Sequence, residues 1–308
     1  MIKKRPVQLS PYHKTRHRVQ KLKVCKHCHS YTILPEEQCA SCGKRTLIPV
    51  TSKAESIASR SMQSNLLLVT LIALVAVLFS NTFVQMALAV VSGIAGVLIL
   101  RWFQRKALPY ETACELNKLI QRDEAAITKG IFRDWEAALE LWKNEPVKAY
   151  EMLREISTVQ RSSTIRLQQV ALLDSFILRK DMDLELEPLL VRHFEPMVAD
   201  YIGELAKIKR DLIKEKALRY VTTFEIEISQ MDNGEAILTA VASAAVRMKR
   251  YVQLYPNYIA RYARHLPKDR FLRLYKMISQ HQVPEWNHLR EEVYQIYKER
   301  YQWDPDFQ

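Results

Sequence analysis

Glycine is scarce in this sequence, and so are the motifs that depend on glycine-rich loops. Only six glycines occur in 308 residues, and three of these follow residue 104. A loop that cradles phosphate groups needs closely spaced glycines because the backbone must approach the ligand. The HExxH helix of zinc proteases and the GxSxG turn of α/β-hydrolases are also absent from the sequence. We therefore expect that this chain is not an enzyme.

Charged residues are missing from one long apolar run, Leu66–Leu100. A single helix of that length would measure about 50 Å, whereas the hydrocarbon core of a bilayer is about 30 Å thick. Small polar residues at Ser80–Thr82 have the chemistry of a turn. The run therefore predicts a transmembrane hairpin with spans at residues 64–79 and 83–103. It begins too late in the chain for a cleavable signal peptide, so none is expected.

Basic residues flank the apolar run on both sides, and none lies in the turn. The flanking residues are Lys53, Arg60, Arg101, Arg105 and Lys106. The positive-inside rule then predicts a two-pass protein of the cell membrane with both termini in the cytoplasm. The run also lacks the ionisable side chains that mark ion or proton paths, which argues against a pump or transporter.

Small residues in the second span would let another helix approach closely. Ala89 and Gly93 lie four positions apart, as do Ser92 and Gly96. The neighbour could be the first span or a second copy of the chain, so a homo-oligomer through these residues is one expectation. The alternative for the whole run is a buried core hairpin of a soluble protein.

Four of the five cysteines form two CxxC pairs near the start of the chain. They are Cys25, Cys28, Cys39 and Cys42, in the pattern C-x2-C-x10-C-x2-C. The first pair precedes His29 and so has the form of a haem attachment site, but the reducing cytoplasm and the second pair favour a metal. Two CxxC turns supply four soft ligands for a tetrahedral, structural Zn²⁺. Whether His27 or His29 replaces a cysteine is left open.

Residues around these pairs resemble a known small module. Pro35-Glu36 lies between the pairs, and Gly43-Lys44 follows the second one. Over residues 24–47 the segment resembles the short zinc ribbons found near the ends of many bacterial membrane proteins. It departs from them at His29, where glycine commonly follows the first pair. The resemblance implies a four-cysteine zinc site; such ribbons contact proteins and nucleic acids alike, so it implies little about function.

The rest of the chain has helical patterns and no sustained strand alternation. Helices are expected from Pro109 to about Thr128, on both sides of Pro146, and at about 161–180, 184–193, 196–229, 234–254, 257–265, 269–280 and 285–301. The fold class is therefore an all-α, membrane-anchored protein whose C-terminal part is an irregular bundle or a short solenoid. The expected divisions are a disordered basic arm (1–23), a zinc ribbon (24–48), a linker (49–63), the hairpin (64–103) and a cytoplasmic helical domain (104–308).

Positive charge is concentrated in two places, the N-terminal part and residues 247–276. Residues 1–64 carry a net charge of +10 and residues 247–276 a net charge of +8. In the second segment tyrosines are interleaved with basic residues, which suits contact with nucleic acid or anionic lipid. The residues that could make this contact are Arg247, Lys249, Arg250, Arg261, Arg264, Lys268, Arg270 and Arg273. The alternative is a buried tyrosine stripe with a solvated basic face.

These features favour an interaction protein. The leading hypothesis is a membrane-tethered cytoplasmic adaptor or regulator that docks partner proteins through its zinc ribbon and helical domain. The alternative is a membrane-tethered nucleic-acid-binding protein that uses the basic arm, the ribbon and residues 247–276. The sequence does not identify the partner protein.

Overall fold

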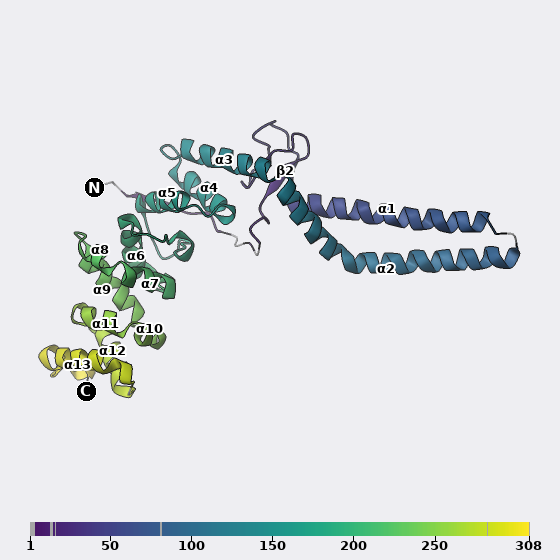
Figure 1. The fold of residues 1–308 in the computed structure, drawn as a ribbon. Coiled ribbons are helices and arrows are strands. Elements are labelled where there is room, and N and C mark those ends of the chain that lie inside the picture. Colours follow the sequence, from purple (N-terminus) through teal and green to yellow (C-terminus); the bar gives the residue numbers. More distant parts are fainter. Residues whose placement is uncertain (1–3, 13–14, 16, 81, 282, 308) are drawn as a thin grey trace. The chain divides into compact units, whose positions relative to one another are not determined.

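The computed structural model describes residues 4–12, 15, 17–80, 82–281 and 283–307, and these residues form two compact units (Figure 1). One unit, here called the hairpin unit, comprises residues 13–140. The other, the helical unit, comprises residues 1–12 together with residues 141–308. Each unit has its own core and is described by itself.

The hairpin unit begins with a small cysteine-rich module, residues 22–49. Its three strands, β2 (Lys23–Cys25), β3 (Tyr31–Thr32) and β4 (Leu47–Pro49), form an antiparallel sheet in the order β3-β2-β4. β2 ends at the first cysteine turn, and β4 ends where α1 begins. Leu22, Val24 and Ile33 are buried in a core too small to stabilise the module alone.

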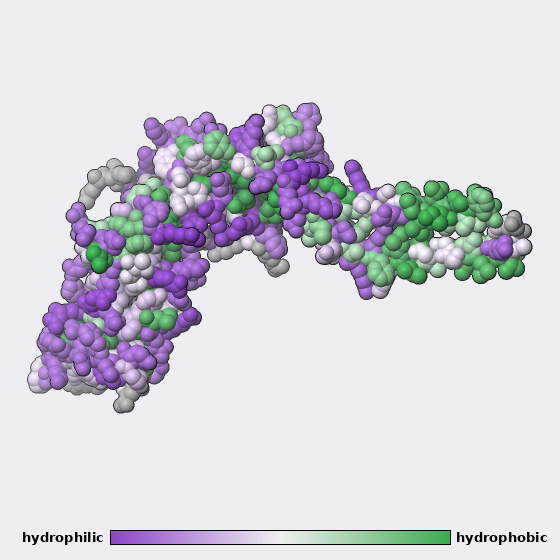
Figure 2. Space-filling model, in the orientation of Figure 1, coloured by the Kyte–Doolittle hydropathy of each residue, from purple (hydrophilic) through white to green (hydrophobic). Residues whose placement is uncertain are grey.

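Two long apolar helices follow, α1 (Val50–Leu78) and α2 (Phe83–Arg122). Each contains an 18-residue apolar stretch in which no residue is buried within the protein. Figure 2 shows the hydrophobic surface that results along both helices. The predicted pair of apolar helices is confirmed, and residues 50–63, expected as a linker, are helical. α1 starts at Val50, whose amide donates to the Leu22 carbonyl at 2.9 Å, so the helix grows directly out of the module.

Small side chains hold α1 and α2 close together. On α1, Val50, Ala54 and Ala58 form a buried stripe at helical spacing. On α2, a methyl group at Gly93 would lie only 2.8 Å from the Ala73 side chain, so this glycine faces the first helix. A methyl group at Gly96 would meet no atom of the described residues within 4 Å, so this position is open.

The turn and the end of α2 both follow from local chemistry. Thr82 caps α2 because its hydroxyl accepts from the Gln85 amide, while Asn81 lies outside the described residues. Pro109, predicted to start a helix, lies inside α2, where the missing amide removes one backbone hydrogen bond. α2 ends at Asp123, and α3 (Glu124–Glu140) follows at once.

The helical unit is a succession of short helices. They are α4 (Pro146–Val159), α5 (Ser163–Asp174), α6 (Pro196–Ile208), α7 (Glu215–Thr223), α8 (Glu225–Ser229), α9 (Gly234–Ala245), α10 (Lys249–Leu254), α11 (Pro256–Tyr262), α12 (Lys268–Gln280) and α13 (Asn287–Ile296). Four 3-10 turns lie between these helices: η1 (Glu187–Leu189), η2 (Arg210–Leu212), η3 (Ala263–His265) and η4 (Pro284–Trp286). After α13 come the π-helical turn η5 (Tyr297–Tyr301) and the 3-10 turn η6 (Pro305–Phe307).

The helices of this unit pack in series, each mainly against the next one in space. α4 packs on α5, α5 on α6, α6 on α9, α9 on α11, and α11 on α13. Aromatic side chains, among them Tyr150, Phe176, Phe271 and Trp286, are fully buried between these layers. This arrangement agrees with the predicted all-α fold of the C-terminal part.

Two helix predictions in this unit are wrong. Residues 184–193 are irregular and contain only the turn η1; Met182, Leu184 and Leu186 are buried at alternate positions, a period that does not suit a helix. The predicted helix at 196–229 is divided into α6, η2, α7 and α8. In both places the chain turns before a full amphipathic helix can form.

The N-terminal arm differs from the disordered leader that its charge suggested. Arg5–Pro6 forms strand β1, which pairs in parallel with β5 (Phe176–Ile177). Lys4 donates to Glu204 at 2.7 Å, which neutralises one of the arm's charges. Specific ion pairs and a strand partner therefore order residues 4–12, and other arm residues (1–3, 13, 14 and 16) lie outside the described residues.

Candidate metal centre

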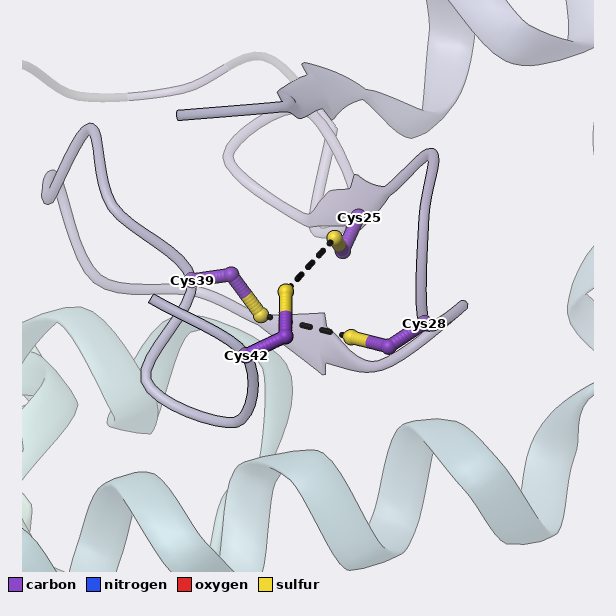
Figure 3. Close-up of side chains that lie close together, drawn as sticks. All are labelled: Cys25, Cys28, Cys39 and Cys42. Atoms are coloured by element: carbon purple, nitrogen blue, oxygen red, sulfur yellow. Dashed lines mark hydrogen bonds between the residues drawn. The ribbon is translucent and has the colours of Figure 1, made fainter. Parts of the chain in front are cut away.

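The four predicted cysteines converge on one point. The Sγ atoms of Cys25 and Cys42 lie 3.7 Å apart, and those of Cys28 and Cys39 lie 3.5 Å apart (Figure 3). All four sulfurs lie within 4.8 Å of one another. Tetrahedral Zn²⁺ with bonds of about 2.3 Å separates its sulfur ligands by about 3.8 Å. The cluster therefore has the size of a metal site, and the donor set is consistent with a zinc-ribbon-like centre.

Each CxxC pair is shaped by the same backbone turn. The His29 amide donates to the Cys25 carbonyl at 3.1 Å, and the Gly43 amide donates to the Cys39 carbonyl at 2.8 Å. The residue after each pair has a positive φ, 56° at His29 and 70° at Gly43. His29 thus takes the position where the resemblance expects glycine, in a conformation that costs an L-residue about 1–2 kcal/mol.

Two hydroxyl groups lie against the sulfurs. Ser30 Oγ is 3.2 Å from the Cys28 sulfur and 3.1 Å from the Cys39 sulfur, so it bridges the two CxxC turns. Thr46 Oγ1 is 3.1 Å from the buried Cys25 sulfur. Hydroxyls in these positions donate to thiolates and orient them toward a common centre.

The thiols differ in acidity because of these contacts. Burial of Cys25 opposes ionisation, but hydrogen bonds from Thr46 and from the amides of Cys28 and His27 outweigh it and lower the pKa of Cys25 to about 5. The pKa of Cys42 is raised to about 12: an amide hydrogen bond from Lys44 favours its thiolate, but burial and the neighbouring sulfurs oppose it more strongly. Four adjacent thiolates repel one another, so a dication is needed to keep all four ionised.

The other candidate ligands lie apart from the cluster. His27 and His29 are exposed, and neither belongs to the group of ligand atoms that converge. Cys114 is in α2 and also lies outside that group. Among the described residues, the candidate ligand set is therefore the four cysteines predicted from their spacing.

A buried aspartate joins the cysteine module to α3. One carboxylate oxygen of Asp134 accepts from the Thr32 hydroxyl at 2.7 Å and from the Ile33 amide at 2.9 Å. Asp134 is only 2% exposed, and this burial raises its pKa. The two donors are the reason that a carboxylate is tolerated there, since an unpaired buried acid would be costly.

Tyr31 supplies the other half of the same interface. Its hydroxyl donates to Asp123 at 2.5 Å, and its carbonyl accepts from Arg133 at 3.0 Å. A methyl group at Gly130 would collide with that carbonyl, so only glycine allows this approach. The sequence predicted that a helix ends at about Thr128, but α3 continues through Gly130, which serves packing.

Sequence reasoning missed this interface, although a signal for it existed. Ile127, Ile131, Asp134 and Ala138 follow one helical stripe, and all four are buried. A carboxylate on the apolar stripe of an amphipathic helix indicates a buried hydrogen-bond partner. The partner itself lies 102 positions away and could not be found from local pattern.

The basic segment 247–276 is largely neutralised within its own unit. Five of the eight proposed contact residues form ion pairs: Arg250 with Glu215, Arg261 with Glu225, Arg264 with Glu299, Lys268 with Asp304, and Arg270 with Asp269. Arg273 donates to the carbonyl of Arg247, and no ion pair of Lys249 is found within the described ranges.

The tyrosines of this segment are divided by Pro256, which begins α11. Tyr251 and Tyr258 are buried, and Tyr258 donates to the Leu238 carbonyl at 2.7 Å. These rings are therefore part of the helical core and are not free for base stacking.

We compared the chain with known proteins and found no relative. No protein-family model, no curated protein and no solved structure matches the chain.

Proposed function

We propose that this protein is a membrane-tethered adaptor whose cysteine module is a structural zinc site. Cys25, Cys28, Cys39 and Cys42 would hold one Zn²⁺, and Ser30 and Thr46 would orient the thiolates. The ion supplies folding energy to a module that lacks an adequate core. Because all four ligands come from the protein, the site leaves no open position for catalysis.

The membrane assignment rests on the hairpin. Eighteen helical residues rise about 27 Å, close to the roughly 30 Å of a bilayer core. No residue in the most apolar part of either helix is buried, and contact of so much apolar surface with water would be unfavourable. Lys106 lies 3.9 Å from the ring centre of Trp102, and such aromatic and basic residues are typical of the membrane interface. Both termini then lie in the cytoplasm by the positive-inside rule.

The observation that carries the adaptor proposal is the attachment of the module to α3. Asp134, Asp123 and Gly130 hold a metal-dependent module against the helix that follows the membrane hairpin. A module held this firmly presents a defined surface, whereas a flexible zinc finger on a linker would not. This suits docking of a partner protein near the membrane.

Nucleic-acid binding is less well supported as the alternative. Phosphate contacts need basic side chains that are free to bind, and five of the eight candidates in residues 247–276 are paired with carboxylates.

The test is affinity capture of the intact protein from membranes in a mild detergent, with and without nuclease, beside the Cys39→Ser variant. A protein partner that resists nuclease and is lost from Cys39→Ser would support the adaptor. Partners that disappear with nuclease would reject it in favour of nucleic-acid binding. Cys114→Ser is the matched control, because Cys114 lies outside the cluster.

A further inference from the structure

A second site lies in the helical unit, in a cleft with strongly basic walls. The cleft has a volume of about 380 Å³. Five cations line it and one acid, Asp211; the cations are Lys180, Lys207, Lys209, Arg210 and Arg247. They come from three separate segments: the loop after β5, the end of α6 with η2, and the connection between α9 and α10.

These cations lack the carboxylate partners that five of the eight basic candidates in residues 247–276 have. Within the described part of the chain, none of the five forms an ion pair. Lys209 donates to the Met182 carbonyl at 2.7 Å, and Arg247 Nε is shielded from solvent without a partner among those residues. Asp181, the acid next to Lys180, is paired with Arg179 at 3.0 Å. Ion pairs within the described residues therefore do not balance the charge of the cleft.

Negative charge in the local structure balances only part of the positive charge of the cleft. Lys207 lies in the last turn of α6, where the helix dipole favours a cation. That dipole is equivalent to about −0.5 of an elementary charge. Together with Asp211 it leaves most of the five positive charges uncompensated. Placing like charges in one concavity destabilises the folded state, and a bound anion would remove the cost.

We propose that this cleft binds a small anion that carries at least two phosphate groups. Arginine matches phosphate oxygens in a bidentate geometry, and lysine serves as a point charge. A single phosphate would leave much of the charge unpaired. The lining contains no aromatic side chain, so a nucleobase would have nothing to stack on. The volume is at the lower end for small-ligand sites, which fits a compact polyanion.

Two sources share this chemistry, a free pyrophosphate-like anion and a lipid headgroup with several phosphates. The experiment uses the full-length protein in a non-ionic detergent without phosphate. Calorimetry with pyrophosphate is compared with calorimetry with a short-chain, water-soluble phosphatidylinositol bisphosphate. We expect saturable binding that weakens as salt is raised. Tight binding of pyrophosphate assigns the free anion, and binding only of the short-chain lipid assigns the headgroup.

Variants show whether the cleft is responsible. Lys180→Gln with Lys207→Gln should weaken binding at least tenfold, because both side chains are exposed and their removal leaves the core intact. Lys214→Gln with Lys298→Gln removes the same charge from exposed positions outside the cleft and should change binding less than twofold. No binding to either probe, or equal losses in the two double variants, would overturn the proposal. Tighter, cleft-dependent binding of a single-stranded oligonucleotide would also overturn it.

Discussion

The hydroxyl of Thr32 donates a 2.7 Å hydrogen bond to the buried carboxylate of Asp134, and this contact joins the cysteine module to α3 across 102 positions of sequence. The same oxygen accepts from the Ile33 amide. One side chain therefore satisfies two buried donors that the short strand β3 would otherwise leave without partners. The module, the start of α1 and α3 form one unit for this reason.

Replacement of Asp134 tests this attachment. Asp134→Ala leaves the Thr32 hydroxyl and the Ile33 amide unpaired and should reduce the free energy of unfolding by about 2 kcal/mol or more. Limited proteolysis should then cut the module faster than in the wild type. Glu136→Ala, an exposed position on the same helix, is the control and should behave as wild type. Equal proteolysis of wild type and Asp134→Ala would contradict the attachment.

His29, the residue with a positive φ after the first cysteine pair, gives a prediction of a stabilising substitution. His29 has φ 56°, so His29→Gly should stabilise the module by up to about 1 kcal/mol and slow transfer of the metal to a chelator. Gly43→Ala, at φ 70°, should destabilise it by about the same amount. His27→Gly is the control, since His27 does not share the positive φ. Faster metal loss from His29→Gly than from His27→Gly would count against this explanation.

Metal content tests the cysteine cluster directly. The purified wild type should contain about one zinc ion per chain, and Cys39→Ser should contain much less, because a hydroxyl is a far poorer zinc ligand than a thiolate. Cys114→Ser should retain the full content because Cys114 lies outside the cluster. Elemental analysis of the three proteins after dialysis makes the comparison. Full zinc content in Cys39→Ser would show that this thiol is not a ligand.

Acid should release the C-terminal turn of the helical unit. Hydrogen bonding with Lys268 lowers the pKa of Asp304, and the pKa of Lys268 rises to about 12 mainly through the hydrogen bond to Asp304. A carboxyl with a lowered folded-state pKa stabilises the fold above its ordinary pKa of about 3.9 and loses that contribution as the pH falls through the lowered value. A lysine with a raised pKa stabilises the fold fully below its ordinary pKa of about 10.4, and this stabilisation is lost as the pH rises toward about 12.

The measurement is amide hydrogen exchange at Phe307, whose amide donates to the Asp304 carbonyl. Its protection should be constant near neutral pH and should fall below pH 4. In Lys268→Gln it should be low and nearly independent of pH, whereas Lys298→Gln should follow the wild type. Unchanged protection in Lys268→Gln would refute the link.

The sequence predicted the features that are encoded locally. The spacing of Cys25, Cys28, Cys39 and Cys42 led to a cluster that the structure confirms, because two CxxC turns bring four sulfurs together. The uncharged run led to two long apolar helices, because their composition alone determines that they are apolar on all sides. Position-specific features such as the start of α1 at Val50 depend on a contact with Leu22 and were not predicted.

Features that depend on distant partners were missed for the same reason. A helix was expected to end at about Thr128, yet α3 runs through Gly130, whose lack of a side chain makes room for the Tyr31 carbonyl nearly 100 positions away. The N-terminal arm looked disordered because of its charge, but Glu204 and β5 order its described part. The cations of the basic cleft come from three segments, so no single window of sequence displays them together.

The central claim is that the apolar hairpin crosses the membrane and leaves the cysteine module and the helical unit in the cytoplasm. Cysteine reporters in the turn, Thr82→Cys, and in the helical unit, Lys249→Cys, test it in a Cys114→Ser background with a membrane-impermeant maleimide. The account predicts that intact cells label Thr82→Cys alone, that permeabilised cells label both, and that the protein resists carbonate extraction. Labelling of Lys249→Cys in intact cells, or release of the protein by carbonate, would contradict it.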